Sequence, residues 1–337
     1  MRETESVIDA RHGTECLLEV RNLGVNFGAV TVLEDVSFEV RAGETLGLVG
    51  ESGSGKSTLA RAVLRLIPAA GGSVHWRGTD LLSCDEATLR RLRRELQIVF
   101  QDPFASLNPR MTVGEALAEP LKIFEPALSR AARTARIDAM LERVGLTAAM
   151  AYGYPHQFSG GQCQRVGIAR AMMLNPKLLI CDEPVSSLDV SIQGQIVNLL
   201  ADLQRDFGTA MLFISHNLAV VRHVSHRVLV MYSGRLVEIA GRDALFGAPV
   251  HPYTRALLGA VPDPARRLPS EPIVGEEAPA GARVATGCLF RARCRHAQPA
   301  CAAARPGLEE VGVGHRVACR RSRELMESSR LSLEAPR

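Results

Sequence analysis

A glycine-rich run with a lysine near its end is the first part of this sequence that indicates chemistry. The run GESGSGKST, Gly50–Thr58, fits the pattern G-x-x-x-x-G-K-[ST] between an apolar stretch and a helical one. Glycines let backbone N–H groups approach phosphate oxygens, and the following helix adds favourable charge at its N-terminus. In such a loop Lys56 would contact the β- and γ-phosphates of a nucleotide, and the Ser57 hydroxyl would bind Mg²⁺. The alternative, an ordinary flexible loop, would need one of only 3 lysines in the chain at this position by chance.

Two adjacent acidic residues at the end of an apolar run are the second candidate. Asp182 and Glu183 follow the run LLIC. A strand that ends in a cleft can present the first carboxylate to Mg²⁺, through water, and the second to a water that attacks the γ-phosphate. Two acids in this position are, by themselves, often a solvated strand end. Together with the lysine loop they predict nucleotide hydrolysis.

The elements that must position these residues follow from hydrophobic periodicity. Short alternating runs between residues 17 and 76 predict strands, several of them antiparallel. Lys56–Ile67 has helical spacing and is followed by a proline, and residues 83–145 are expected to be mostly helical. The unbroken apolar runs KLLICDE and AMLFISH flank a helical pattern, which predicts buried parallel strands. A hairpin is expected to turn at Ser233-Gly234.

Length and composition restrict the class of protein. The chain has 337 residues, is 46% hydrophobic and 23% charged, and carries a net charge of +4, which fits about two globular domains and does not indicate nucleic-acid binding. No apolar run reaches the roughly 18 residues of a membrane span, and the first residues are too polar for a signal peptide. We therefore expect a cytoplasmic protein with reduced or metal-bound cysteines, which meets a membrane only through partners.

Four of the 8 cysteines lie within 32 residues near the end of the chain, with the spacing C-x₅-C-x₆-C-x₁₇-C. Four thiols in a reducing compartment suggest a metal site. The C-x₂-C pairs of structural zinc are missing, and an iron–sulfur cluster, whose irons lie farther apart than the ligands of one zinc, suits the spacing at least as well. A cluster, zinc and free thiols remain the three interpretations. Arg291, Arg293 and Arg295 would offset thiolate charge. His315 could either support the ligands by a hydrogen bond or substitute as a ligand. The four cysteines are Cys288, Cys294, Cys301 and Cys319.

Three further motifs join the first two, and together they resemble the ATP-binding-cassette ATPases. The run FSGGQCQR lies between the phosphate loop and the acids, with its serine 103 residues after Lys56 and 23 before Asp182. Gln101 ends the apolar run QIVFQ, a Ser-Leu-Asp sequence follows the acids, and His216 ends the next apolar run. The match covers roughly residues 17–240.

The resemblance implies a role for each motif. The lysine loop would be the family's Walker A loop. The SGGQ signature would cap the γ-phosphate of the nucleotide bound to a partner subunit, so hydrolysis would need a dimer. Gln101 would sense Mg²⁺ and nucleotide and link to membrane subunits, while Asp189 lies in the D-loop position. Phe27 would stack on adenine, with a core strand position as its alternative. The implied nucleotide contacts are Phe27, Gly50, Glu51, Ser52, Gly53, Ser54, Gly55, Lys56, Ser57, Thr58, Ser159, Gly160, Gly161, Gln162, Asp182 and Asp189, with Ser57, Gln101 and Asp182 at Mg²⁺ and with Glu183, His216 and Gln101 in catalysis.

A closer resemblance is to the ATPase subunits of oligopeptide and dipeptide importers, nearest the F-type member of the heterodimeric pair. It rests on the runs FQDPFASLNPRMTVGEALAEPL, YPHQFSGGQCQRVGIARAMMLNP, DEPVSSLDVSIQGQIVNLL, ISHNLAVV and HPYTRALLGAVP. Cys163 stands where those relatives usually carry a basic residue, which bears on the strength of the signature's contacts. Similar tails in such ATPases imply a 4Fe–4S cluster at the four cysteines.

This resemblance also implies partners and a location. The chain would pair with a second ATPase subunit, in a hetero- or homodimer, beneath two permease subunits that an extracytoplasmic substrate-binding protein supplies. It would lie at the cytoplasmic face of the membrane, hydrolyse ATP with Mg²⁺ and power peptide import, and Gln101–Met111 would contact the permeases. An importer for nickel or another small solute is the alternative.

The implied fold class is α/β: a P-loop NTPase of the ATP-binding-cassette type. It would have a mixed core sheet, an antiparallel β subdomain, a helical signature subdomain and a small cysteine-containing extension. We expect a flexible arm at 1–16, a nucleotide-binding domain at 17–262 with its helical part at about 102–170, and the extension at 263–337.

Two non-transport ATPases with the same motifs are rival functions. A DNA-repair ATPase would carry a coiled-coil or zinc-bearing insertion between the lysine loop and the signature, whereas this interval of 103 residues has no cysteine pair and no heptads. A translation-associated ATPase would need two cassettes, and only one fits in this length.

Overall fold

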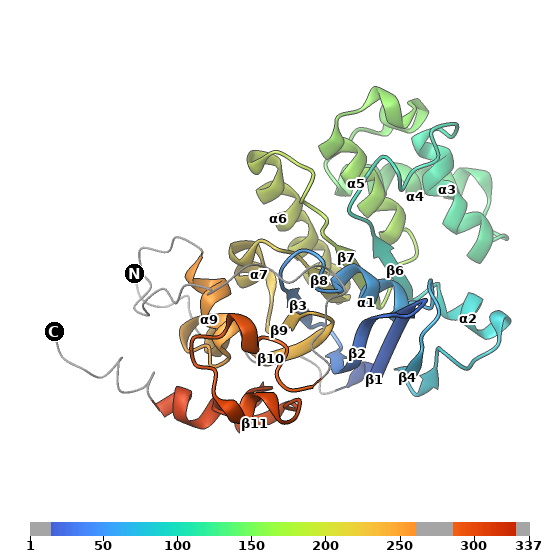
Figure 1. Ribbon diagram of the computed structural model, residues 1–337. Helices are drawn as coiled ribbons and strands as arrows, with labels where there is room; N and C mark the ends of the chain where they lie inside the picture. Colours follow the sequence, from blue (N-terminus) through green and yellow to red (C-terminus); the bar gives the residue numbers. More distant parts are fainter. Residues whose placement is uncertain (1–14, 261–285, 328–337) are drawn as a thin grey trace.

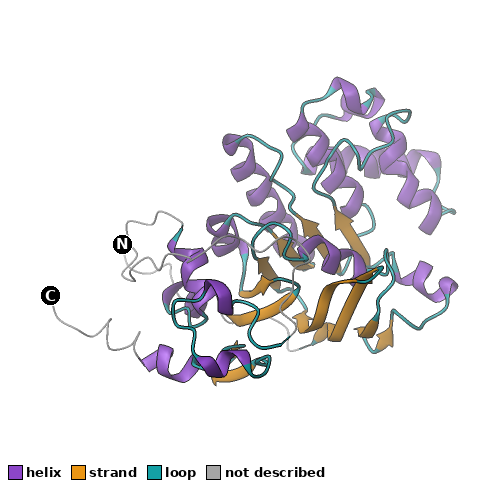
Figure 2. Cartoon of the chain, in the orientation of Figure 1, coloured by secondary structure: helices purple, strands orange, loops and turns teal. Residues whose placement is uncertain are grey.

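The computed structural model describes residues 15–260 and 286–327. The expected arm, the linker after residue 262 and the last ten residues therefore lie wholly or almost wholly outside the described parts. Within these parts the chain forms two sheets with helices packed around them (Figures 1 and 2). The expected α/β fold class, with a mixed sheet and a separate antiparallel sheet, is confirmed.

The larger sheet has the strand order β11-β12-β10-β9-β3-β8-β7-β6. The neighbours from β9 to β6 pair in parallel, and the β9–β10 hairpin and both pairs that contain β12 are antiparallel. Every residue of β3, β7 and β8 is buried, as expected of strands covered on both faces. The strands are β3 (Thr45–Val49), β6 (Leu96–Val99), β7 (Leu178–Asp182), β8 (Ala210–Ile214), β9 (Arg227–Tyr232), β10 (Arg235–Gly241), β11 (Glu309–Gly312) and β12 (His315–Val317).

The smaller sheet is antiparallel and has the order β2-β1-β4-β5. Its strands alternate buried and exposed residues because only one face packs on the core. They are β1 (Cys16–Phe27), β2 (Val30–Arg41), β4 (Gly71–Trp76) and β5 (Thr79–Asp80).

Figure 1 shows one group of helices and the C-terminal segment at opposite ends of the molecule. Helices α3, α4 and α5 lie together beyond β6, and the C-terminal segment, residues 286–327, lies at the other end of the molecule beside α9 and β10. The helices are α1 (Lys56–Val63), α2 (Glu86–Leu92), α3 (Val113–Phe124), α4 (Arg130–Arg143), α5 (Gly160–Met172), α6 (Val190–Phe207), α7 (Leu218–Val224), α8 (Arg242–Gly247) and α9 (Pro252–Gly259), with short 3₁₀ turns η1 (Ala148–Tyr152), η2 (Pro155–Gln157), η3 (Arg291–Arg293) and η4 (Pro299–Ala302).

The core is split by the larger sheet into two hydrophobic clusters, one on each face. Along β7, Leu179 and Cys181 pack into one cluster, and Leu178 and Ile180 into the other. This alternation follows from the two-residue period of a strand. None of the helices in the described parts is long and apolar enough to cross a membrane.

Three sequence expectations are corrected or refined by the structure. Helix α1 ends at Val63 rather than Ile67, because Arg65 has a positive φ of 51° and the chain turns there. Residues 83–145, expected to be mostly helical, also include the strand β6. The expected hairpin turn is present, with Ser233 and Gly234 both at positive φ, 45° and 77°.

Candidate functional site

The phosphate loop connects β3 to α1 and depends on its glycines. A Cβ on Gly50 would lie 2.2 Å from the Met231 carbonyl oxygen, and Gly55 has a φ of 105° that side chains rarely adopt. Gly55 is also the N-cap of α1, and no side chain caps the helix there. The first N–H groups of α1 are therefore available to an anion, as a phosphate-binding loop requires.

Lys56 is held against the same loop. Its Nζ donates to the carbonyl oxygens of Gly50 at 2.9 Å and Glu51 at 2.8 Å, and the residue is 4% exposed. Burial lowers the pKa of the ammonium group, and nearby carboxylates oppose this effect. A buried cation gains from any added anionic partner, so the loop is suited to hold a polyphosphate.

Ser57 and Asp182, separated by 125 residues in the chain, meet at the ends of α1 and β7. The Ser57 Oγ donates to Asp182 Oδ1 at 2.8 Å. Burial raises the pKa of the Asp182 carboxyl, and the bond from Ser57 opposes this rise. A hydroxyl and a carboxylate provide the oxygen ligands that Mg²⁺ prefers, so this pair fits the expected metal.

Glu183 is the meeting point of three strand ends. Its φ is +48°, a conformation uncommon outside glycine that often marks functional sites. Gln101 Nε2, after β6, donates to Glu183 Oε2 at 3.4 Å, and His216 Nδ1, after β8, lies 3.2 Å from the same oxygen. The structure thus brings together the three residues that the sequence analysis expects in catalysis.

The SGGQ signature lies apart from this cluster. It begins α5, where the Ser159 Oγ accepts from Gln162 N–H at 3.3 Å and Gln162 Oε1 accepts from Ser159 N–H at 2.9 Å. Ser159 is exposed. Within the described parts of the chain, no hydrogen bond or ion pair joins the signature to the phosphate loop of the same chain. The buried Cys163 donates to the Pro155 carbonyl at 3.3 Å.

Two other expected contacts are exposed. Phe27, at the end of β1, is 51% exposed, so the alternative interpretation of a core residue is wrong. Asp189 is exposed at the N-cap position of α6, where its side chain makes no capping bond. Both side chains are therefore free of the core, as a contact to a nucleotide or a partner would require.

The four C-terminal cysteines line one cavity, together with His251 and Phe290. Burial, and to a smaller extent the other three thiols, raise the pKa of the Cys319 thiol to about 12. No three His, Cys, Asp or Glu residues in the described ranges are arranged to hold a single metal ion. His315 instead pairs with Glu238, at 2.7 Å from Nε2 to Oε1, so the interpretation of His315 as a substitute ligand is not supported.

Sequence reasoning missed the contact between this cysteine segment and the phosphate loop. Arg293, expected to offset thiolate charge, directs its guanidinium to Glu51 at 2.9 and 3.1 Å. Tyr253 accepts a hydrogen bond from the Glu51 N–H at 2.9 Å. These residues come from segments separated by about 200 residues or more, and no local pattern could have joined them.

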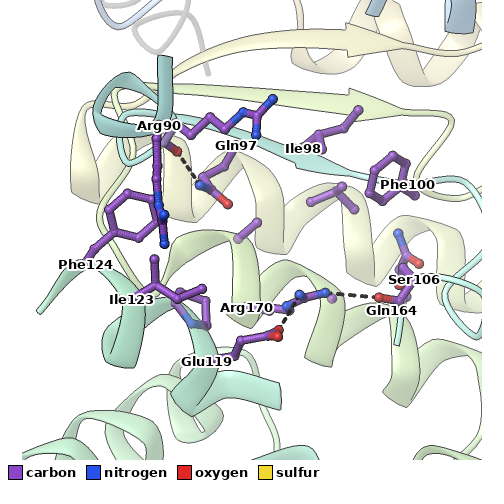
Figure 3. A pocket seen from close by; sticks show the side chains of 15 residues that line it. Arg90, Gln97, Ile98, Phe100, Ser106, Glu119, Ile123, Phe124, Gln164 and Arg170 are labelled. Carbon is purple, nitrogen blue, oxygen red and sulfur yellow. Dashed lines mark hydrogen bonds and ion pairs between the residues drawn. The ribbon is translucent and has the colours of Figure 1, made fainter. Parts of the chain in front are cut away.

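A separate cavity of about 400 Å³ opens between β6 and the helices α2, α3 and α5 (Figure 3). Arg170 lines this cavity, and its guanidinium donates to the Glu119 carboxylate at 2.7 Å and to the Ser106 carbonyl oxygen at 3.1 Å. Phe124 and Ile123 contribute apolar surface, and Ile123 is 49% exposed. The cavity adjoins Phe100, the residue before Gln101.

Two family models match the chain. The model described as ABC transporter matches residues 33–186, and the model described as oligopeptide/dipeptide transporter, C-terminal region, matches residues 237–301. The second match includes three of the four C-terminal cysteines.

Curated relatives are similar over almost their entire length. The chain is 48% identical to the oligopeptide transport ATP-binding protein OppF of Salmonella typhimurium, over 93% of this chain and 98% of the relative. It is 47% identical to the putative oligopeptide transport ATP-binding protein YkfD of Bacillus subtilis, over 90% of this chain and 94% of the relative.

Solved structures share the fold. The ATP-binding cassette MJ0796, in a dimeric post-hydrolysis state bound to ADP and Pi, is 28% identical with a TM-score of 0.62, over 67% of this chain and 99% of that one. The cbiO1 protein of Clostridium perfringens, part of an ABC transporter complex, is 26% identical with the same TM-score. The match covers 69% of this chain and 91% of that one.

Proposed function

This chain belongs to the oligopeptide-transporter branch of the ABC transporter ATPases, and on that premise we propose that it binds and hydrolyses ATP to power peptide import through partner permeases. The observation that carries the proposal is the convergence of Gln101, Glu183 and His216 beside the Ser57–Asp182 pair. This arrangement supports a base, its orienting groups and a metal-binding pair beside one phosphate loop.

The chemical roles follow from these positions. The loop N–H groups and Lys56 bind the phosphates, while Ser57 and Asp182 would hold Mg²⁺, Asp182 through water. When bound, Mg²⁺ supplies positive charge that offsets the charge developing on the phosphate oxygens. Glu183 accepts a proton from the attacking water. Gln101 and His216 fix the orientation of that carboxylate.

A dimer completes the site. The exposed signature at the start of α5 has no bond to its own phosphate loop in the described ranges, and it presents helix N-terminal N–H groups that suit a phosphate. It serves the nucleotide of a second ATPase subunit. Opening and closing of this interface transmits the energy of hydrolysis.

Permease subunits dock on the cavity of Figure 3 and on the adjacent Gln101–Met111 segment. The cavity combines exposed apolar side chains with arginines, which suits an amphipathic helix from a partner. Its position next to Gln101 links the docked helix to the catalytic carboxylate. The chain then lies at the cytoplasmic face of the membrane, and a substrate-binding protein delivers the peptide from outside.

The four cysteines hold a 4Fe–4S cluster in this proposal. Their thiols surround one cavity, yet no three groups in the described ranges are placed as ligands of a single ion. The shared cavity and the missing C-x₂-C pairs of structural zinc are what support a cluster, whose ligands attach to separate irons, over one zinc. The cluster would connect loops that have little core of their own.

Reconstitution tests the transport function. The chain is combined with its partner ATPase, two permeases and the binding protein in vesicles, and uptake of labelled peptides and of nickel is measured with ATP inside or outside. Peptide uptake that needs ATP on the side of this chain and is lost in Lys56→Ala is expected. Uptake of nickel alone would favour the alternative cargo, and ATPase activity equal in the isolated monomer and the assembly would contradict the dimeric site.

Metal analysis tests the cluster. After anaerobic purification, about four irons and four sulfides per chain and a broad visible absorption are expected. Stoichiometric zinc, or a colourless metal-free chain that folds and transports normally, would contradict it.

A further inference from the structure

One charged pair, between a buried arginine and a half-buried glutamate, joins the C-terminal segment to the phosphate loop. Arg293 is 8% exposed, and its guanidinium donates two parallel hydrogen bonds to the Glu51 carboxylate, Nη1 to Oε2 at 2.9 Å and Nη2 to Oε1 at 3.1 Å. Bidentate pairs of this kind fix orientation as well as distance. The contact therefore determines where the second residue of the loop lies.

Glu51 is held at all three of its polar groups. Its N–H donates to Tyr253 Oη at 2.9 Å, and its carbonyl oxygen accepts from Lys56 Nζ at 2.8 Å. Arg293 holds the carboxylate. Because Lys56 donates to the Glu51 carbonyl oxygen, a displacement of Glu51 changes the surroundings of the lysine that would bind phosphate.

The position of Arg293 depends in turn on an aromatic cluster formed by Tyr232, Tyr253 and Phe290. Phe290 is 2% exposed and packs edge-on against Tyr232, with ring centroids 5.3 Å apart. The Arg293 guanidinium lies 5.9 Å from the Tyr232 ring centroid, within the range of a cation–π contact. Phe290 and Arg293 lie between the first two of the four cysteines, so folding of that short stretch places the arginine.

We propose that Arg293 is a positioning residue of the phosphate loop, which couples folding of the C-terminal segment to nucleotide affinity by holding Glu51. This inference rests on the proposed nucleotide site. Without the arginine, the Glu51 carboxylate loses its counter-charge in a loop that receives a polyphosphate, and its repulsion opposes binding. Because coupling free energies are reciprocal, bound nucleotide stabilises the segment in return.

The experiment measures the Kd for Mg-ATP by calorimetry, and the thermal midpoint without nucleotide, in the full-length chain. The variants are Arg293→Ala, Arg293→Lys, Glu51→Gln and the Arg293→Ala, Glu51→Gln double variant. The matched control is Arg305→Ala, which removes an ion pair from the same segment to Glu34 in β2, outside the loop.

We expect Arg293→Ala to weaken Mg-ATP binding about fivefold or more. Arg293→Lys should weaken Mg-ATP binding less, because an ammonium group keeps the positive charge and loses only the two parallel hydrogen bonds of the guanidinium. Arg305→Ala should stay within about twofold of wild type, as a change outside the loop does. In the Glu51→Gln background the effect of Arg293→Ala should shrink by at least about half, because the two residues act on each other.

Equal affinities of the Arg293→Ala and Arg305→Ala variants would overturn the inference while leaving the proposed function intact. A folded wild-type chain that does not bind Mg-ATP would contradict both. If Arg293→Ala does not fold, Arg293→Lys decides: weaker binding at an unchanged thermal midpoint supports the inference, and unchanged binding overturns it. Hydrogen exchange of residues 286–294 gives an independent readout, because Mg-ATP should slow it in wild type and not in the arginine variants.

Discussion

The phosphate loop and the four-cysteine cavity are built in opposite ways. Central parallel strands hold the first, and every residue of β3, β7 and β8 is buried. The second lies on loops and the short 3₁₀ turns η3 and η4. It is positioned by contacts to the rest of the chain, among them the β10–β12 pairing and the Arg293–Glu51 pair. The nucleotide site thus has its own scaffold, whereas the cysteine site depends on its neighbour.

The largest expected effect is a loss of ATP hydrolysis at the phosphate site in a variant that keeps its fold. Glu183→Gln should lower ATP hydrolysis by about 10² or more while ATP binding stays near wild type, because only the base is lost. The measurements are ATPase activity of the assembled transporter and the Kd for Mg-ATP. Lys56→Ala should fail at binding instead. Turnover above about a tenth of wild type in Glu183→Gln would remove Glu183 from this role.

Matched glycine substitutions test whether the two sites fail separately. A Cβ at Gly50 would lie 2.2 Å from the Met231 carbonyl oxygen, and one at Gly287, at φ +78°, would lie 2.4 Å from the Cys301 carbonyl oxygen. Each change to Ala should cost about 2 kcal/mol or more locally. Gly50→Ala should lose nucleotide binding and keep any bound metal, and Gly287→Ala should show mainly the reverse, by calorimetry and metal analysis.

Gly194→Ala is the control for these substitutions, since a Cβ there would meet nothing within 4 Å. Its helical position in α6 should leave stability unchanged or raise it by up to about 1 kcal/mol. Loss of nucleotide binding in Gly287→Ala as complete as in Gly50→Ala would mean that the two sites form one cooperative unit.

Removal of the four thiols tests how far the phosphate loop depends on the cysteine site. Cys→Ser at all four cysteines should abolish metal binding and weaken Mg-ATP binding only a few-fold, by about the coupling that Arg293 carries. Metal content, thermal unfolding and Kd are measured on one preparation. Affinity as poor as in Lys56→Ala would show that the phosphate loop has no independent scaffold.

The smallest effect is expected far from both sites. Asp85 caps α2, where its side chain accepts from Thr88 N–H at 2.6 Å. Asp85→Ala should lower the free energy of unfolding by about 1 kcal/mol and leave ATP affinity and metal content unchanged. A shift in either would show that ordinary loss of stability mimics the site-specific effects above.

The phosphate site could be placed from sequence because regular elements create it. Gln101 joined this site only through the family resemblance. The carboxyl ends of parallel strands meet at one edge of a sheet, so Asp182 and His216, which end the two runs predicted to be parallel strands, could be expected near each other. Their geometry agrees with that expectation, and their chemical roles are what the proposed experiments test. The strand β6 itself was not predicted, because four residues inside a helical stretch give too short a period.

The surroundings of the cysteine site could not be predicted in the same way. Spacing indicated four thiols that act together, and they line one cavity. The partner of Arg293 is 242 residues away, and such a contact leaves no periodic trace in sequence. The local interpretation of Arg293 was charge balance near thiolates, and the half-buried carboxylate of Glu51 in the loop is its stronger partner.

The pairing of β12 with β10 also protects the molecule from unwanted association. Glu238 pairs with Val317 and Ile239 with Arg316, so the short hairpin covers a flank of β10 in which five successive residues are buried. A chain cut before residue 315 would present the unpaired N–H and C=O groups of an apolar strand to solvent, a template for strand addition by another copy. The C-terminal hairpin thus covers an edge that would otherwise favour association of copies of this protein.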